Sequence, residues 1–115
     1  MKRISLMAAG CAALVACAGV QAAPDRDAVL DFNSCAKPVY PAEAITALRE
    51  GTVTLTFLVR KDGMVGESKV MKSSGHPDLD TAARDALKVC KFVPAIKKGK
   101  PVQEWTNVQY VWTLK

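Results

Sequence analysis

The sequence predicts an α+β domain in which a three-stranded antiparallel sheet carries two helices on one face, in the order helix, strand, strand, helix, strand. Three observations predict this class. Over residues 52–59, every second side chain is apolar and the side chains between them are mostly Thr, which is the two-residue period of a half-buried strand. Asp62-Gly63 then separates this strand from a second one over residues 65–72, as in a β-hairpin. A helical apolar stripe follows, and another alternating run occupies residues 104–114.

The first 22 residues have the pattern of a secretory signal peptide. A basic start, Met1-Lys2-Arg3, precedes an apolar stretch rich in Ala and Leu, and Val20-Gln21-Ala22 precedes a possible cleavage point ahead of Ala23. The predicted organisation is a signal peptide over residues 1–22, a linker over residues 23–34 and one domain over residues 35–115.

Two other readings of the N-terminal segment stay open. Leu14-Val15-Ala16-Cys17 resembles a bacterial lipobox, in which Cys17 would carry lipid and become the mature N-terminus. Residues 4–20 could also stay uncleaved as a membrane anchor, because no charge occurs between Arg3 and Asp25 and this length can cross about 30 Å of hydrocarbon as a helix. The Ala-rich composition, interrupted by Gly and Gln, favours cleavage.

The cysteine count agrees with export. Removing residues 1–22 deletes Cys11 and Cys17 and leaves an even pair, Cys35 and Cys90, on either side of the presumed core. Paired cysteines are typical of an oxidising compartment. We therefore predict a disulfide between Cys35 and Cys90 that contributes roughly 4 kcal/mol on the loop-entropy model. Two buried free thiols are the alternative.

Charge does not indicate a nucleic-acid partner. The whole chain has a formal net charge of +5, and Lys2 and Arg3 leave with the signal peptide, so the mature part carries about +3. Lys97-Lys98-Gly99-Lys100 is the one basic cluster, and it lacks interleaved aromatic residues or a helix that could enter a groove. A solvated loop accounts for it.

The segment before the first strand contains one short helix. Residues 24–31 are polar and short of large apolar side chains, which indicates a linker or a loosely docked arm. Pro38 and Pro41 impose an extended path on the next residues. Pro41 also suits the first turn of a helix, so residues 42–50 are predicted as a helix of about two turns that Gly51 stops.

The second helix follows the hairpin. Ser73-Ser74-Gly75-His76 is a turn, and Pro77 opens the helix with two aspartates near its positive end. Phe92-Val93-Pro94-Ala95 ends this helix, and a turn at residues 97–101 leads to the last strand. The stripe that can lie on the buried face of the hairpin consists of Leu79, Ala82, Ala83, Ala86, Leu87 and Cys90.

These residues resemble the C-terminal domain of TonB and stand-alone TonB-like periplasmic proteins. The resemblance covers about residues 35–115 and rests on five blocks in order. The blocks are Lys37-Pro38-Val39-Tyr40-Pro41, Glu50-Gly51-Thr52-Val53, Asp62-Gly63-Met64-Val65, Ser73-Ser74-Gly75-His76-Pro77-Asp78-Leu79-Asp80-Thr81-Ala82-Ala83 and Phe92-Val93-Pro94-Ala95.

The resemblance implies a periplasmic protein-binding module. Members of this family bind an extended segment of outer-membrane transporters, the TonB box, by adding it as a strand beside the last strand, which fits the chemistry of an unpaired sheet edge. One face of the last strand holds Val108, Tyr110, Trp112 and Leu114, which fit a core or rim. The candidate peptide-binding residues are those of the other face, Trp105, Asn107, Gln109, Val111 and Thr113.

The chain also departs from full TonB proteins. In the family that this chain resembles, full TonB proteins have a membrane helix bearing a functional His, then a long Pro-rich spacer, then this domain. Residues 1–75 of this chain contain no His. The 11 residues from Pro24 to Ser34 reach at most roughly 40 Å when extended. A short membrane-anchored energy transducer and a lipoprotein with an assembly role remain alternatives, and a second copy of the chain is another possible occupant of the edge.

The sequence offers little for enzyme chemistry. His76 is the sole His, and its neighbours Asp78 and Asp80 fit the start of a helix better than a metal or catalytic site. Ser73 and Ser74 lie two or three residues before His76, which is turn chemistry. We predict no enzymatic activity, no cofactor and no metal.

Export gives the first testable prediction. The intact mass of the purified protein should match a chain that starts at Ala23, because the small residues before it suit signal peptidase. A mass that includes residues 1–22 would exclude cleavage, and a triacylated chain starting at Cys17 would place the protein among the lipoproteins.

Overall fold

The structure is a computed structural model, in which residues 24–115 are described. The predicted signal peptide, the lipobox with Cys17 and the alternative anchor therefore lie outside the described residues. Within residues 24–115, no helix has the length and apolarity needed to cross a bilayer.

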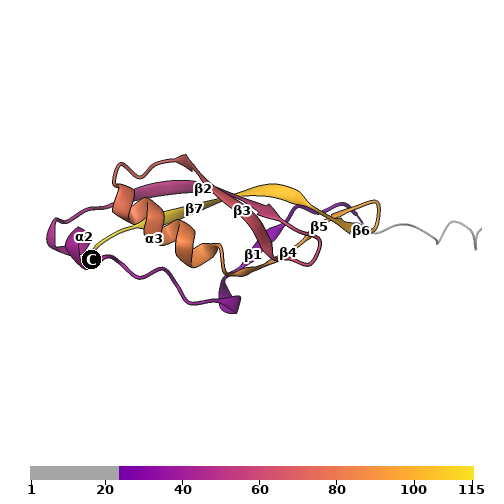
Figure 1. The fold of residues 1–115 in the computed structure, drawn as a ribbon, viewed down its shortest axis with the longest axis horizontal. Helices are drawn as coiled ribbons and strands as arrows, with labels where there is room; N and C mark the ends of the chain where they lie inside the picture. Colours follow the sequence, from indigo (N-terminus) through magenta and orange to yellow (C-terminus); the bar gives the residue numbers. More distant parts are fainter. Residues whose placement is uncertain (1–23) are drawn as a thin grey trace, which may run out of the picture.

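The predicted α+β class is confirmed. Helix α2 (Ala42–Thr46) precedes a hairpin of β2 (Gly51–Val59) and β3 (Val65–Lys72), after which come helix α3 (Pro77–Leu87) and the last strand, β7 (Glu104–Trp112). These strands form one antiparallel sheet in the order β3-β2-β7, with β2 in the centre (Figure 1). Hydrophobic periodicity was therefore sufficient to predict this order of elements.

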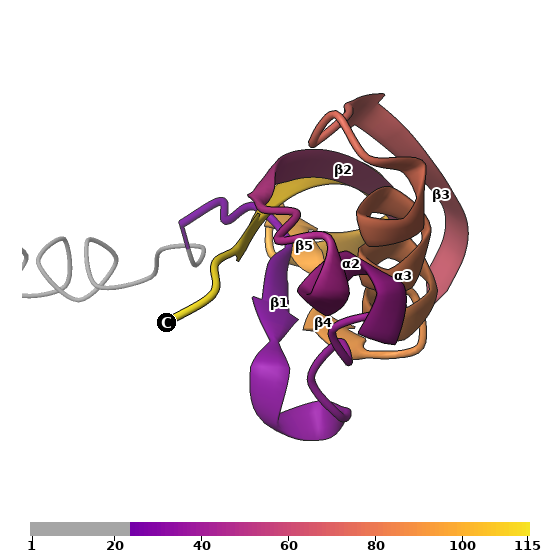
Figure 2. The ribbon, with the colours of Figure 1, turned by 90° about the vertical axis from the view of Figure 1, so that its left-hand side faces the viewer.

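The core lies between the sheet and helix α3. The inward side chains of β2, Val53, Leu55, Phe57 and Val59, are fully buried. They join Leu79, Ala83 and Leu87 of α3 and Ala44 of α2 in a single cluster. Viewed from the end, both helices lie on the concave side of the curved sheet (Figure 2). None of the helices in the described residues lies over the opposite face of the sheet (Figure 2).

The hairpin turn is held against a distant part of the chain. Gly63 adopts a φ of +86°, and a Cβ atom there would lie 2.3 Å from the carbonyl oxygen of Phe92. The Phe92 amide in turn donates to the Gly63 carbonyl at 2.8 Å. Both the backbone conformation and this close approach require glycine. The Asp62-Gly63 signal thus positions the hairpin on the segment after α3.

Helix α2 is shorter than the sequence predicted. It ends at Thr46, and Leu48 takes a left-handed φ of +56° that turns the chain out of the helix. The Arg49 amide donates back to the Ala44 carbonyl at 2.8 Å, which is the six-to-one bond of a Schellman ending. Gly51, predicted as the stop, has another role, because a Cβ there would lie 2.6 Å from the Ser74 carbonyl oxygen.

The segment predicted as a linker or loose arm is docked. Strand β1 (Val29–Asp31) pairs antiparallel with β4 (Lys91–Val93), and Arg26 exchanges two backbone hydrogen bonds of 2.8 Å with Ile96. Ile96 belongs to β5 (Ala95–Lys97), which forms a small hairpin with β6 (Lys100–Val102). The sequence prediction missed this pairing because the strands are three residues long, too short for alternation to register.

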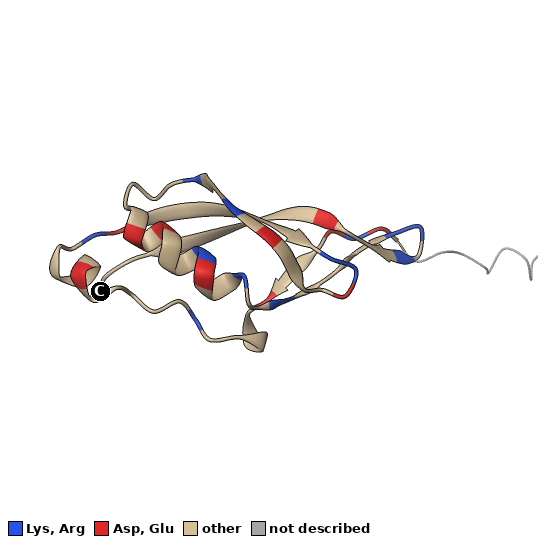
Figure 3. Cartoon of the chain, viewed as in Figure 1, with Lys and Arg blue, Asp and Glu red and all other residues tan. Residues whose placement is uncertain are grey.

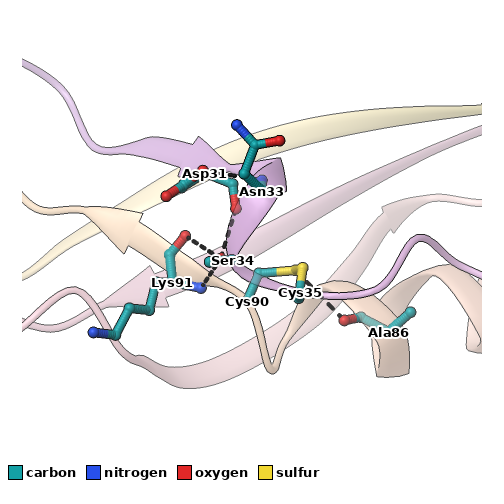
Figure 4. Close-up of a disulfide and its surroundings, with 7 residues drawn as sticks. All are labelled: Asp31, Asn33, Ser34, Cys35, Ala86, Cys90 and Lys91. Carbon is teal, nitrogen blue, oxygen red and sulfur yellow. Dashed lines mark hydrogen bonds between the residues drawn. A yellow bond between two sulfur atoms is a disulfide. The ribbon is translucent and has the colours of Figure 1, made fainter.

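The arm is also attached covalently. A disulfide joins Cys35 to Cys90 just beyond helix α3, with 5.0 Å between the Cα atoms, in agreement with the prediction (Figure 4). Next to it is a short 3-10 helix, η1 (Phe32–Ser34). The Ser34 hydroxyl accepts from the Lys91 amide at 2.8 Å and donates to the Asp31 carbonyl at 2.6 Å. The bond and these hydrogen bonds fix the arm beside β4.

A buried carboxylate organises the turn before α3. Asp80 is 7% exposed and accepts from the Ser74 amide at 2.8 Å, from the Ser74 hydroxyl at 2.6 Å and from the Ser73 hydroxyl. Burial alone would raise the pKa of Asp80, but these hydrogen bonds outweigh it and hold the pKa below its ordinary value of 3.8. The Ser-Ser-Gly-His-Pro-Asp-Leu-Asp run is therefore a structural motif.

The Asp80 network predicts a pH dependence of stability. A carboxyl group whose pKa is lowered on folding stabilises the fold above its unfolded pKa, and this stabilisation is lost as the pH falls through the folded value. Asp80→Asn should lower the free energy of unfolding by about 1–3 kcal/mol at pH 7. Urea titrations should show the gap from wild type closing as the pH falls below 3.8. A gap that stays constant down to pH 2 would contradict the assignment.

The disulfide predicts a loss of stability on removal. The bond closes a sequence separation of 55 residues, and Cys35 is partly exposed, so Cys35→Ser tests the bond with little loss of packing. We expect the free energy of unfolding to fall by about 2–4 kcal/mol. Thiol labelling of the unfolded, unreduced wild type should find neither Cys35 nor Cys90 free. Stoichiometric labelling of both would refute the bond in solution.

Candidate functional site: an open sheet edge

Strand β7 forms one edge of the main sheet. Among residues 24–115 it pairs with β2 alone. The register is unbroken from Gly51 opposite Trp112 to Val59 opposite Glu104, so β7 pairs with β2 over nine residues without a bulge. The other side of β7 thus presents backbone groups that β2 does not use.

The direction of these backbone groups follows from one contact. The Thr56 hydroxyl of β2 donates to the Thr106 carbonyl at 3.2 Å, so this carbonyl points toward β2. In an antiparallel ladder without bulges, successive residues direct their amide and carbonyl groups to alternate sides. The outward groups therefore belong to Trp105, Asn107, Gln109 and Val111.

The same residues form an exposed row of side chains. Along β7, residues 104, 106, 108, 110 and 112 are half-buried or buried on the helix side, and the alternate residues are exposed. Trp105 is 40% exposed and Val111 is 61% exposed. Thr113 continues this row beyond the end of the strand. The structure thus brings the five predicted site residues together along one edge.

The two edges of the sheet differ. The β2–β3 ladder has register shifts near both ends, and β3 carries Glu67, Lys69 and Lys72. Bulges and charges are the devices by which proteins protect an edge from further pairing. On β7 the only charged residue is Glu104 at its start, and the strand contains no proline. The structure therefore leaves β7 as the edge suited to another strand.

An interaction that sequence reasoning missed lies at the start of this edge. The Lys69 Nζ atom of β3 lies 4.9 Å from the centre of the Trp105 ring, on the face of the sheet that no helix covers. This is a cation–π contact. Lys69 and Trp105 come together only through the pairing of β3 with β2 and of β2 with β7. Their spacing along the sequence therefore did not predict the contact.

Aromatic residues hold the far end of β7. The Trp112 ring is 4.8 Å from Tyr40 and 4.9 Å from Tyr110, both in edge-to-face geometry. Partial burial, with Glu50 and Asp78 nearby, raises the pKa of Tyr40, so its hydroxyl keeps the proton that it donates to the Arg49 carbonyl. Trp112 is 3% exposed, in agreement with the prediction of a core residue.

A charged cluster holds the start of β7. Lys97 lies 3.5 Å from both Asp27 of the arm and Glu104. Burial alone would lower the pKa of Lys97, but the two carboxylates outweigh it and hold the pKa above its usual value. One cation thus ties the arm, the small hairpin and β7 together, and the Thr106 hydroxyl adds a bond to the Ala28 carbonyl at 3.3 Å.

Ligand pockets and clusters of metal-ligating side chains are absent from the part of the chain that the structure describes. Residues 24–115 have no pocket and no group of three His, Cys, Asp or Glu side chains placed to hold a metal ion. The Ser74 hydroxyl bonds directly to Asp80, and His76 lies at the N-cap of α3. The open edge is therefore the candidate site.

Comparisons with known proteins agree on one family. The family model for the Gram-negative bacterial TonB protein C-terminal domain matches residues 36–114. The protein tonB2 of Pseudomonas aeruginosa is 44% identical over 71 residues, covering 62% of this chain and 26% of the relative. Protein TonB of Haemophilus influenzae is 38% identical over 76 residues, covering 66% of this chain and 27% of the relative.

A solved structure shows the same fold. The solution structure of the Pseudomonas aeruginosa TonB C-terminal domain superposes with a TM-score of 0.62 at 24% identity, covering 83% of this chain and 94% of that chain. The chain spans about a quarter of the length of the curated relatives, so the match concerns their C-terminal domain. On this evidence, the chain belongs to the family of Gram-negative bacterial TonB protein C-terminal domains.

Proposed function

We propose that this protein is a binding module of the bacterial envelope that accepts an extended peptide as an added strand along β7. The observation that supports this most is the unbroken β7 ladder, whose outer side is free of charge from Trp105 to Val111. An extended peptide beside β7 would continue the sheet to four strands and pair the outward amide and carbonyl groups.

The affinity would come chiefly from backbone hydrogen bonds. The described residues have no pocket beside β7 that could hold a ligand side chain. Side chains of the outer row would then select among peptides instead of anchoring them, with Asn107 and Gln109 offering amide groups and Val111 an apolar surface. This division is characteristic of recognition by strand addition.

The proposed partner is an extended segment of an outer-membrane transporter, of the TonB-box type. The support is membership of the TonB C-terminal family together with the open edge. The same edge could instead pair with a second copy of the chain, because an antiparallel strand can pair with itself about a two-fold axis. Binding of a transporter segment would give the protein a role in TonB-dependent transport, whereas pairing with a second copy of the chain would not.

We further propose that the domain acts in the periplasm without enzymatic activity. The pattern of residues 1–22 and the Cys35–Cys90 bond support export to an oxidising compartment. A short membrane-anchored transducer is less well supported, since the stretch that would serve as its spacer is bound to β4 and β5 from Arg26 onward. A lipid-anchored form at Cys17 places the same edge in the same compartment.

Strand addition predicts a selective effect of proline at position 109. Gln109→Pro removes an outward amide donor from an edge strand, which can tolerate proline. We expect it to weaken binding of a synthetic TonB-box peptide about tenfold or more, measured by calorimetry. Gln109→Ala keeps the amide and should retain most of the affinity. Far-UV dichroism must show both variants folded.

The other edge provides the matched control. Met71→Pro removes an amide from β3 at a position where the register is already shifted and the side chain is 61% exposed. It should leave the affinity for the peptide unchanged. Equal losses from the two proline variants, or unchanged amide shifts over residues 105–113 while the peptide binds elsewhere, would refute addition at β7.

A further inference from the structure

Among residues 24–115, Lys69 is the cation that lies over the aromatic end of the β7 edge. Its side chain starts on β3, crosses the central strand and ends 4.9 Å from the Trp105 ring centre. In the register of the sheet, Lys69 is opposite Thr56 of β2, and Trp105 is opposite Leu58. The side chain therefore runs diagonally across the uncovered face toward the open edge.

This ammonium group makes no ion pair within the described chain. No carboxylate of residues 24–115 lies within ion-pair distance of Lys69. Glu67, two residues away on the same strand, makes no ion pair with it. The aromatic ring is thus the partner of Lys69, and the acidic residue of β7, Glu104, lies 3.5 Å from Lys97. Acidic and basic residues are spread over the whole fold (Figure 3).

A strand added at β7 would bring its side chains within the field of this cation. Neighbouring strands lie about 4.8 Å apart, and Trp105 belongs to the outward row that such a strand would face. A ligand side chain opposite Trp105 would meet the exposed 40% of the indole, with the ammonium beyond the ring. Apolar contact and a positive potential coincide at this end of the edge, whereas Asn107, Gln109 and Val111 are neutral.

On the basis of the proposed function, we infer that Lys69 and Trp105 form a specificity site for a carboxylate-bearing residue at the end of the bound peptide that lies against Trp105. Lys69 supplies the charge, and its contact with the ring fixes where that charge lies. The site distinguishes acidic from neutral peptides of the same shape, and it sets the direction in which the peptide lies along β7.

Four synthetic peptides test this inference. Each has eight alternating Val and Thr residues and an uncharged polyethylene glycol tail, with blocked ends, and they differ in carrying Glu or Gln at one end or the other. With wild-type protein at low salt, one Glu peptide should bind about two- to fivefold tighter than its Gln counterpart, as expected for one partly solvated charge pair. The difference should shrink at 0.5 M salt, where charges at the surface are screened.

Variants of Lys69 separate charge from packing. Lys69→Gln should abolish the preference for Glu while leaving the affinity for the Gln peptide unchanged, and Lys69→Arg should restore the preference, because Arg also stacks on indole. Lys72→Gln removes an exposed cation from the same strand and should leave the preference intact. A structural role for Lys69 alone would change the affinities for both peptides equally.

The outcomes distinguish the two proposals. Peptides that bind at β7, as judged by the loss in Gln109→Pro, but with no Lys69-dependent preference for Glu would overturn this inference and leave strand addition standing. Peptides whose binding Gln109→Pro does not affect, or that do not bind at all, would overturn strand addition and the specificity site with it.

Discussion

The pairing of β2 with β7 is the interaction on which the rest of this fold depends. Strand β2 has Val53, Leu55, Phe57 and Val59 fully buried under the helices, and it is paired on both sides, with β3 and with β7. Strand β7 pairs with it over nine residues without a shift, and Tyr40 packs against its far end. This continuous pairing, together with the burial of Trp112, supports β7 on one side, while its other side has no partner strand among the described residues.

Strands β3, β4 and β7 differ in how far they are protected from pairing with a further strand. Strand β3 has a shifted register and carries charged residues, and β4 is paired with β1 of the chain's own arm. Strand β7 has an unbroken register and no charged residue from Trp105 to Trp112. Strands β3 and β4 are thus protected from pairing with a further strand, whereas β7 is not. Neither device is present on β7 from Trp105 to Trp112, which is the edge that the proposed function uses.

Periodicity and turn chemistry predicted the sheet, helix α3 and the row from Trp105 to Thr113, because each depends on a repeated local pattern. The docked arm escaped prediction because β1 has three residues and acquires its structure from β4, far along the chain. The ending of α2 escaped because Leu48 adopts a left-handed conformation that glycine usually takes. Lys69 escaped because its relation to Trp105 exists only once three strands are in register.

The position of the disulfide bears on how the chain crosses a membrane. The family model begins at residue 36, so Cys35 and the arm lie outside the part of the chain that the model matches. Passage through a secretion channel requires an unfolded chain, and cytosolic thiols stay reduced. If the Cys35–Cys90 bond forms after export, the domain lacks this stabilisation before translocation. It is then easier to unfold before translocation than afterwards. If residues 1–22 direct export, the domain reaches its full stability only after translocation, in the compartment where the disulfide forms.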